Sequence, residues 1–271
     1  MQVRFDAYTA TTGSLMPNAA MDCLMFDADT VKQGGGHHGF RHRLVVSGAD
    51  GHQTGSVQYG GQHPDLVMIE VKGERTPAVV DKLRAVAPGH NCTRVDSCCD
   101  FEFPGAFEAL LAPCTGVKKE HKLRGSKAGD WDDFPEDGRT LYLGAATSVA
   151  RARLYEKGLQ PEYRHLNRAD YCRLELQVRP SKDSKQIYSQ LDALQVWGCS
   201  RWTRDLAARV LESEVLAHPA GTIRRETSRD RALRFMCKQY GAHIMSLMHE
   251  YGSYDEVGKH LHQLVIEAKE S

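Results

Sequence analysis

The sequence lacks several features that would place it in a common class of protein. It has no run of about 20 apolar residues that could cross a bilayer, and its start, MQVRFDAYTATTG, has no apolar core of a signal peptide. It also has no G-x-x-x-x-G-K-S/T motif, which argues against ATP hydrolysis by this chain. We therefore expect a soluble cytoplasmic protein with no membrane attachment.

The chain also lacks paired cysteines and an excess of either charge. None of its eight cysteines forms a C-x-x-C pair, which favours free, mostly buried thiols over zinc or disulfides. Lys plus Arg and Asp plus Glu number 35 each, so the net charge gives no sign of a nucleic-acid partner. Any DNA-binding signal must therefore be local.

The pattern of apolar residues predicts an α+β protein. Residues 76–87 have a proline just inside their start and apolar spacing of three and four, which predicts a helix. After about residue 200 the sequence becomes helical. Alternating or apolar runs typical of strands occur at 1–10, 43–48, 55–61, 66–73, 93–103, 140–144, 150–158 and 171–180.

The two halves of the strand-rich region resemble each other. Residues 69–83 and 174–188 both place a glutamate on a strand ahead of a helix, and QYGG at 58–61 is similar to LYLG at 141–144. We predict a central antiparallel sheet with helices packed on one face, a weak internal duplication and a helical C-terminal extension. The predicted domains are residues 1–200 and a helical accessory region, residues 201–271.

Residues two apart on a strand share a face, and this parity groups polar side chains on three strands. If the strands share a sheet, carboxylates, a tyrosine and cations converge, as phosphoryl transfer with a divalent metal requires. The same alternation also occurs in any half-exposed antiparallel strand. The grouped residues are Asp96, Cys98, Asp100 and Glu102, then Arg153, Tyr155 and Lys157, and then Arg173, Glu175 and Gln177.

Between residues 94 and 180 the chain resembles the replication initiation factor family. This family comprises rolling-circle plasmid initiators, relaxases of conjugative elements and replication proteins of filamentous phages. The matching segments are RVDSCCDFE (94–102), GRTLYLGAATSVARARLYEKG (138–158) and CRLELQVR (172–179). The middle segment is the most specific, because it joins a Tyr-x-Gly strand to an Arg-x-Tyr-x-Lys strand.

The resemblance implies an enzyme that nicks one DNA strand at an origin and stays joined to the 5′ phosphate through a tyrosine. Residues 1–200 would then be the nicking domain. Tyr155 would be the nucleophile, with Lys157 and either Arg153 or Arg173 supporting the phosphate. The expected cofactor is Mg²⁺ or Mn²⁺, and its expected ligands are Asp96, Asp100 and Glu175.

Two features leave alternatives open. GLQPEYRH follows Lys157 where the family often has an acidic and aromatic run, so Tyr163 is a second candidate nucleophile. A basic run could follow a DNA backbone together with Arg173, or could be only a solvated edge. The residues of this run are Lys118, Lys119, Lys122, Arg124 and Lys127.

The expected partners are single-stranded or extruded origin DNA and the helicase and replication machinery of a bacterial host. A homodimer is compatible with the sequence. The alternative function is a non-catalytic DNA-binding protein that recognises an origin or operator with the same sheet.

Overall fold

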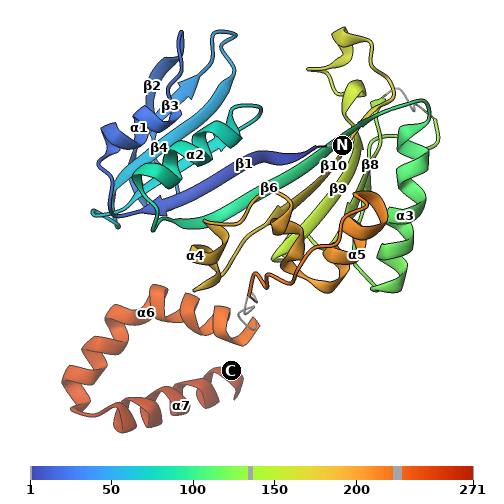
Figure 1. Cartoon of the computed structure of the whole chain (residues 1–271). Coiled ribbons are helices and arrows are strands. Elements are labelled where there is room, and N and C mark those ends of the chain that lie inside the picture. Colours follow the sequence, from blue (N-terminus) through green and yellow to red (C-terminus); the bar gives the residue numbers. More distant parts are fainter. Residues whose placement is uncertain (1, 134–136, 222–227, 271) are drawn as a thin grey trace. The chain divides into compact units, whose positions relative to one another are not determined.

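The fold is built on one antiparallel sheet of ten strands (Figure 1). The structure is a computed structural model and describes residues 2–133, 137–221 and 228–270. The strands lie in the order β2-β3-β4-β5-β1-β6-β10-β9-β8-β7. Their bounds are β1 Val3–Thr12, β2 Thr30–Gly35, β3 Phe40–Ser47, β4 Gln53–Gly61, β5 Val67–Lys72, β6 Asn91–Glu102, β7 Lys127–Ala128, β8 Thr140–Leu143, β9 Ala150–Glu156 and β10 Tyr171–Val178.

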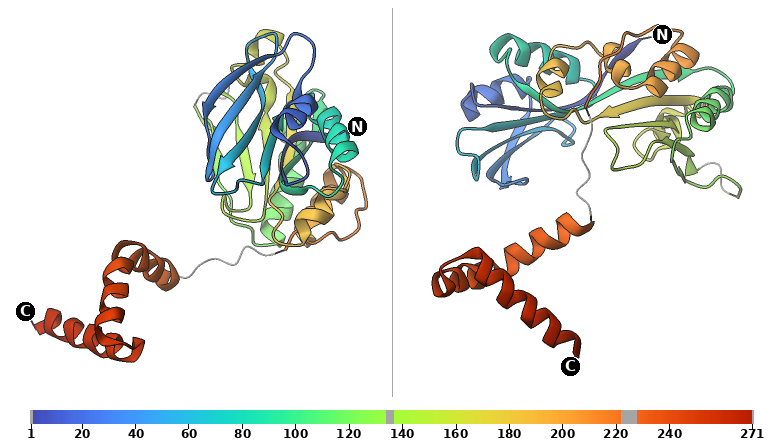
Figure 2. Two further views of the ribbon diagram at one scale, coloured as in Figure 1. Left: turned by 90° about the vertical axis from the view of Figure 1, so that its left-hand side faces the viewer. Right: turned by 90° about the horizontal axis from the view of Figure 1, so that it is seen from below.

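Helices cover one face of this sheet, as the right-hand view of Figure 2 shows. They are α1 (Pro17–Leu24), α2 (Thr76–Val86), α3 (Ala106–Glu120), α4 (Ser184–Tyr188) and α5 (Arg201–Val210), with a 3-10 turn, η4, at Gln195–Cys199. Helix α2 begins where the proline signal predicted it. The α+β class, the central antiparallel sheet and the helical C-terminus are therefore confirmed.

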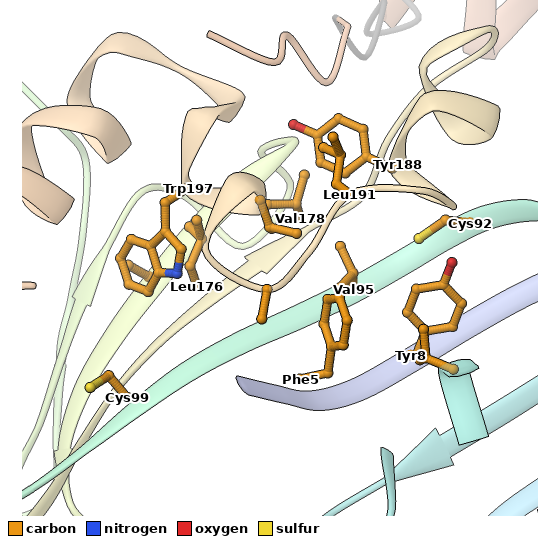
Figure 3. Close-up of a cluster of buried hydrophobic side chains, with 14 of the residues drawn as sticks. Phe5, Tyr8, Cys92, Val95, Cys99, Leu176, Val178, Tyr188, Leu191 and Trp197 are labelled. Atoms are coloured by element: carbon orange, nitrogen blue, oxygen red, sulfur yellow. The ribbon is translucent and has the colours of Figure 1, made fainter. Parts of the chain in front are cut away.

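The core lies between the helices and the sheet. Leu174, Leu176 and Val178 point from β10 into this core and are fully buried, whereas the residues between them face the opposite side. Trp197 of η4 is buried there too, and its indole N–H donates to the Ser97 hydroxyl of β6 at 2.9 Å (Figure 3). The alternation of apolar and polar residues along the strands thus determines which face of the sheet carries polar side chains.

The strand order contains an internal symmetry. Reading outward from the centre, β1-β5-β4-β3-β2 on one side corresponds to β6-β10-β9-β8-β7 on the other. The similar segments 69–83 and 174–188 fall on β5 with α2 and on β10 with α4, which are equivalent positions. The second predicted match is wrong, because QYGG lies on β4 and LYLG on β8, whereas the equivalent of β4 is β9.

Residues 224–271 form a second unit, separate from residues 1–223. Its helices are α6 (Ser228–Tyr251) and α7 (Tyr254–Glu270). This division differs from the boundary at residue 200 that the change to a helical pattern suggested. The reason is that α5 belongs to the first unit, where Arg209 donates two hydrogen bonds to the Glu120 carboxylate of α3.

Among the described residues, no helix combines the length and the apolar character needed to cross a membrane.

Candidate active site

The three strands that parity singled out are neighbours in the sheet. Strand β10 pairs with β6 on one side and with β9 on the other, and Arg173 lies opposite both Asp100 and Tyr155. Glu175 lies opposite Arg153 in the same way. Since directly opposed residues share a face, the structure brings the predicted carboxylates, tyrosine and cations together on the face away from the helices.

Arg173 lies at the centre of this face. Its side chain is 2% exposed, and its guanidinium donates to Asp100 of β6 at 2.5 and 2.7 Å and to Asp6 of β1 at 2.5 Å. Arg4 of β1 donates to the same Asp100 carboxylate at 2.7 Å. Arg173, predicted to contact DNA, is thus held among carboxylates.

Asp6 and Arg4 are site residues that the sequence reasoning missed. The strand at residues 1–10 was predicted, and its polar positions 4 and 6 alternate with Val3 and Phe5 on the apolar side. The parity argument could have found them. What it could not give is the pairing of β1 with β6, which joins residues about 90 positions apart in the chain.

Tyr155 is buried beside a carboxylate. Its side chain is 4% exposed, and its hydroxyl donates to Glu175 Oε2 at 3.3 Å. Arg153 donates to the same oxygen at 2.9 Å, and its guanidinium lies 4.7 Å from the centre of the Tyr155 ring. The phenol therefore lies between an acceptor and a cation.

The surroundings shift the pKa of both partners upward. Burial raises the pKa of Tyr155 far above its usual range, and the Glu175 charge adds to this effect. Burial also raises the pKa of Glu175, and the nearby Asp96 charge acts in the same direction, whereas Arg153 opposes it. The phenol of Tyr155 therefore stays protonated at rest. Its hydroxyl donates to Glu175, a carboxylate that burial makes more basic than an exposed glutamate.

Lys157 lies just beyond β9, in the 3-10 turn η2 (Lys157–Leu159). It is 5% exposed, and its ammonium lies 4.6 Å from the ring centre of Tyr163 and 5.5 Å from that of Tyr171. Burial, followed by the charge of Arg173, lowers the pKa of Lys157 to about 8. Lys157 can therefore change protonation state near neutral pH.

The carboxylates predicted as metal ligands are each bound to an arginine. Asp96 accepts two hydrogen bonds from Arg94, at 2.9 and 2.5 Å, while Arg153 holds Glu175. Asp100 is bound by arginines and by the Tyr171 hydroxyl. Across the described ranges, no three His, Cys, Asp or Glu side chains form a group that could hold a metal ion. The predicted three-ligand set is therefore not assembled.

Two of the three carboxylates remain close to each other. Asp96 and Glu175 lie on adjacent strands, are each 2% exposed and face the same side. Asp96 lies opposite Gln177, which is two residues from Glu175 on β10, and the Asp96 charge raises the pKa of Glu175. Two buried like charges are a donor set that a divalent cation would stabilise.

A cavity of about 700 Å³ opens beside Tyr155. Tyr155, Lys157 and Arg173 line it on one side, and Lys72 and Arg75 on the other. Tyr163, the second candidate nucleophile, also lines this cavity, and its ring packs edge to face on Tyr171 at 6.3 Å. The lining also includes Asp6, Asp50, Glu74 and Glu162, so a phosphate in the cavity would meet carboxylates as well as cations and the phenol.

The basic run lies elsewhere. Lys118 and Lys119 are in the last turn of α3, and Lys122 and Arg124 follow that helix. Because α3 packs on the helical face, the run is not brought to Tyr155. Lysines at this end of a helix also interact favourably with the helix dipole, which is a structural reason for their presence.

The fold built around this site has a known counterpart. It is shared with a replication initiator. The solved structure of a rolling circle replication initiator protein from Geobacillus stearothermophilus matches with a TM-score of 0.50 and 18% sequence identity, over 73% of this chain and 83% of that chain. No family model and no curated protein sequence matches. At this identity the likeness supports the predicted family at the level of the fold.

We predict that Asp100→Asn destabilises the protein by about 2 kcal/mol at neutral pH, because it removes a charged partner from buried Arg173. Burial alone would raise the pKa of Asp100, but the hydrogen bonds and charge of Arg173 lower it to about 2. This lies below the value of about 3.9 in an unfolded chain. The stabilisation is therefore complete above about pH 4 and is lost as the pH falls toward 2.

Thermal unfolding of both proteins from pH 7 to pH 2 measures this effect. The difference in melting temperature between wild type and Asp100→Asn should shrink across the acid range. The control is Asp81→Asn, which changes an exposed aspartate on α2. Equal melting temperatures for wild type and Asp100→Asn at neutral pH would contradict the role assigned to this ion pair.

Proposed function

We propose that the protein is a rolling-circle replication initiator that nicks one strand of an origin and becomes covalently joined to the 5′ phosphate. The observation that carries the proposal is that the buried Tyr155 hydroxyl donates to Glu175, which is also bound by the guanidinium group of Arg153. The shared fold supports it, since the matching structure is described as a rolling circle replication initiator protein. The motifs at residues 94–102, 138–158 and 172–179 support it independently.

In the proposed reaction Glu175 acts as the general base. Its raised pKa makes it able to accept the proton of Tyr155, whose own pKa is too high for spontaneous ionisation. The phenolic oxygen then forms a bond to the scissile phosphorus while the bond from phosphorus to the 3′ oxygen breaks. The fragment that begins with this 5′ phosphate stays joined to Tyr155 as a phosphotyrosine.

Lys157 acts as the general acid in this scheme. It lines the same cavity as Tyr155, and a pKa of about 8 allows it to be protonated at neutral pH and to release that proton readily. It donates the proton to the departing 3′ oxygen, which becomes the 3′ hydroxyl used for primer extension. Arg153 neutralises charge on the phosphate oxygens as the transition state forms.

The remaining parts of the function follow from the reaction. Tyr155 is buried within the sheet face, so the substrate is single-stranded or extruded DNA that can enter the adjoining cavity. The sequence carries no ATP-binding loop, so strand separation falls to a helicase of the bacterial host, in whose cytoplasm the protein works. A homodimer remains a prediction.

Tyr155→Phe should abolish the covalent adduct and retain DNA binding, because only the nucleophilic oxygen is removed. The measurement incubates end-labelled origin DNA with the protein and Mg²⁺ or Mn²⁺, and then separates adducts on a denaturing gel. The matched variant is Tyr163→Phe, which changes a tyrosine of the same cavity and should leave adduct formation within about twofold of wild type.

The two tyrosine variants have distinct contrary outcomes. Adduct formation by Tyr155→Phe together with its loss in Tyr163→Phe would make Tyr163 the nucleophile. Absence of any adduct with wild type, while origin DNA still binds, would leave the non-catalytic DNA-binding protein as the function of this face.

The rate of nicking should fall as the pH rises through about 8, because the protonated form of Lys157 is the active one. Single-turnover nicking between pH 6 and 10 measures this decrease, the alkaline limb of the pH profile. In Lys157→Arg the guanidinium stays charged over the whole range, so the limb should disappear and the rate should be about 100-fold lower, since arginine gives up a proton poorly. A limb that stays near pH 8 in Lys157→Arg would rule out Lys157 as its source.

We also propose that nicking requires a divalent metal. Asp96 would hold it together with Oε1 of Glu175, the oxygen that does not contact Tyr155, because Asp100 is already bound by two arginines. When bound, the ion would neutralise negative charge on the scissile phosphate. EDTA should abolish adduct formation, and Mg²⁺ or Mn²⁺ should restore it.

Asp96→Asn should raise the metal concentration needed for half-maximal nicking by about tenfold, in line with the loss of a metal-binding carboxylate. Asp100→Asn, assayed well below its melting temperature, is the control and should leave this concentration unchanged. Full activity in EDTA would contradict the metal requirement and leave Glu175 and Lys157 as the complete catalytic set.

A further inference from the structure

A second, smaller pocket lies on the same open face. It has a volume of about 120 Å³ and is lined by residues of β6, β8, β9 and β10. Three guanidinium groups border it, from Arg94, Arg151 and Arg153, against one carboxylate, that of Glu175. The other lining residues are Tyr142, Ala152 and Gln177.

Arg151 differs from the other two arginines of this pocket. Arg94 is paired with Asp96 and Arg153 with Glu175, whereas the Arg151 side chain forms no hydrogen bond or ion pair with any residue that the structure describes. Its Nε is buried and without a partner. Arg153 Nε is likewise buried and unpartnered. Buried donors of this kind are normally satisfied, so they indicate a missing acceptor.

The pocket also holds Arg151 in place. Its guanidinium stacks on the Tyr142 ring, 3.8 Å from the ring centre. Gln177 of β10 lies opposite Arg151 in the pairing of β9 with β10 and donates to Asp96 at 3.3 Å. The arginine is therefore oriented by stacking and not by a carboxylate, which leaves its N–H groups for an anion.

The position of the pocket connects it with Tyr155. Arg151, Arg153 and Tyr155 alternate along β9 and share its open face. At about 3.3 Å per residue, Arg151 lies about 13 Å from Tyr155 along the strand. The large cavity with Lys157 borders Tyr155 at the other end of β9. Tyr155 thus lies between the arginine-lined pocket and the larger cavity, whose lining mixes cations and carboxylates.

We propose that the Arg94–Arg151–Arg153 pocket binds a phosphodiester of the DNA strand close to the scissile one. This inference rests on the proposed function and adds a path for the strand, from the pocket across Tyr155 into the cavity. A planar guanidinium with free N–H groups is the side chain best suited to binding phosphate oxygens. The contact positions the strand and carries no base specificity.

The first test measures binding of a fixed-sequence single-stranded oligonucleotide to the full chain with Tyr155→Phe, so that no cleavage occurs. Adding Arg151→Gln should weaken binding about tenfold. It should also reduce the slope of log K against log salt by about 0.7, the value for one lost phosphate contact on a single strand. The matched control is Arg201→Gln, which removes an exposed arginine on α5 and should change neither quantity.

The second test locates the contact. Once the nicked bond has been mapped with wild type, oligonucleotides spanning it are made with one neutral methylphosphonate linkage at each position in turn. At one linkage close to the scissile phosphate, the neutral group should weaken binding to Tyr155→Phe. In the protein that also carries Arg151→Gln, the same substitution should have little further effect, since the contact is already lost.

Two results would overturn the inference. One is Arg151→Gln binding as tightly and with the same salt slope as the Arg201→Gln control. The other is a methylphosphonate effect of the same size with and without Arg151. A wild-type protein that forms no covalent adduct would refute the proposed function instead, and the oligonucleotide binding assay would still report on Arg151.

Discussion

The structure depends on the ion pairs of one buried side chain, the guanidinium of Arg173. It links three strands, because it lies on β10, bonds Asp100 on β6 and bonds Asp6 on β1. Removing one partner of such a buried pair leaves a charge without compensation, which is costly. Any slip of β10 by one residue would carry Arg173 into the apolar core, so the ion pairs reinforce the register that places Tyr155 opposite Arg173.

The internal symmetry shows why the residues of the proposed site belong mainly to one half of the sheet. Glu70 on β5 is the equivalent of Glu175 on β10, and the position equivalent to Tyr155 is Gln58 on β4. Glu70 accepts hydrogen bonds from Ser56 and Gln58, both neutral. The first half thus retains the carboxylate and lacks the phenol and the guanidinium. Its contribution to the site is made through β1, which supplies Asp6 and Arg4.

Parity and local signals predicted much of this arrangement. The alternation of Arg173 with Leu174 and of Tyr155 with Leu154 is local, and a sheet with one apolar face leaves no other orientation for these side chains. The start of α2 was equally local. The residues that sequence reasoning missed are those whose roles depend on distant pairing, as with β1 beside β6.

The expected metal site illustrates the same limit. The sequence shows that Asp96, Asp100 and Glu175 share a face, but it does not show which cation each carboxylate meets. Arg94 lies on the same strand as Asp96, while Arg173 reaches Asp100 from the neighbouring strand. The boundary at residue 200 was placed where the sequence becomes helical, and that local signal could not show that Arg209 of α5 bonds to Glu120 of α3.

The neutral net charge of the chain is compatible with the proposed DNA-binding face because, around Asp96 and Glu175, the carboxylates are buried and their arginines are exposed. Asp96 and Glu175 are each 2% exposed, while the arginines that hold them, Arg94 and Arg153, are 41% and 39% exposed. In the proposed function, a DNA strand approaching this part of the face would therefore meet guanidinium groups first, with the compensating carboxylates beneath them. The buried carboxylates fix these arginines in place and would leave their outer N–H groups for phosphates. The attraction for a DNA strand would then come from the local arrangement of charges and not from the net charge of the chain.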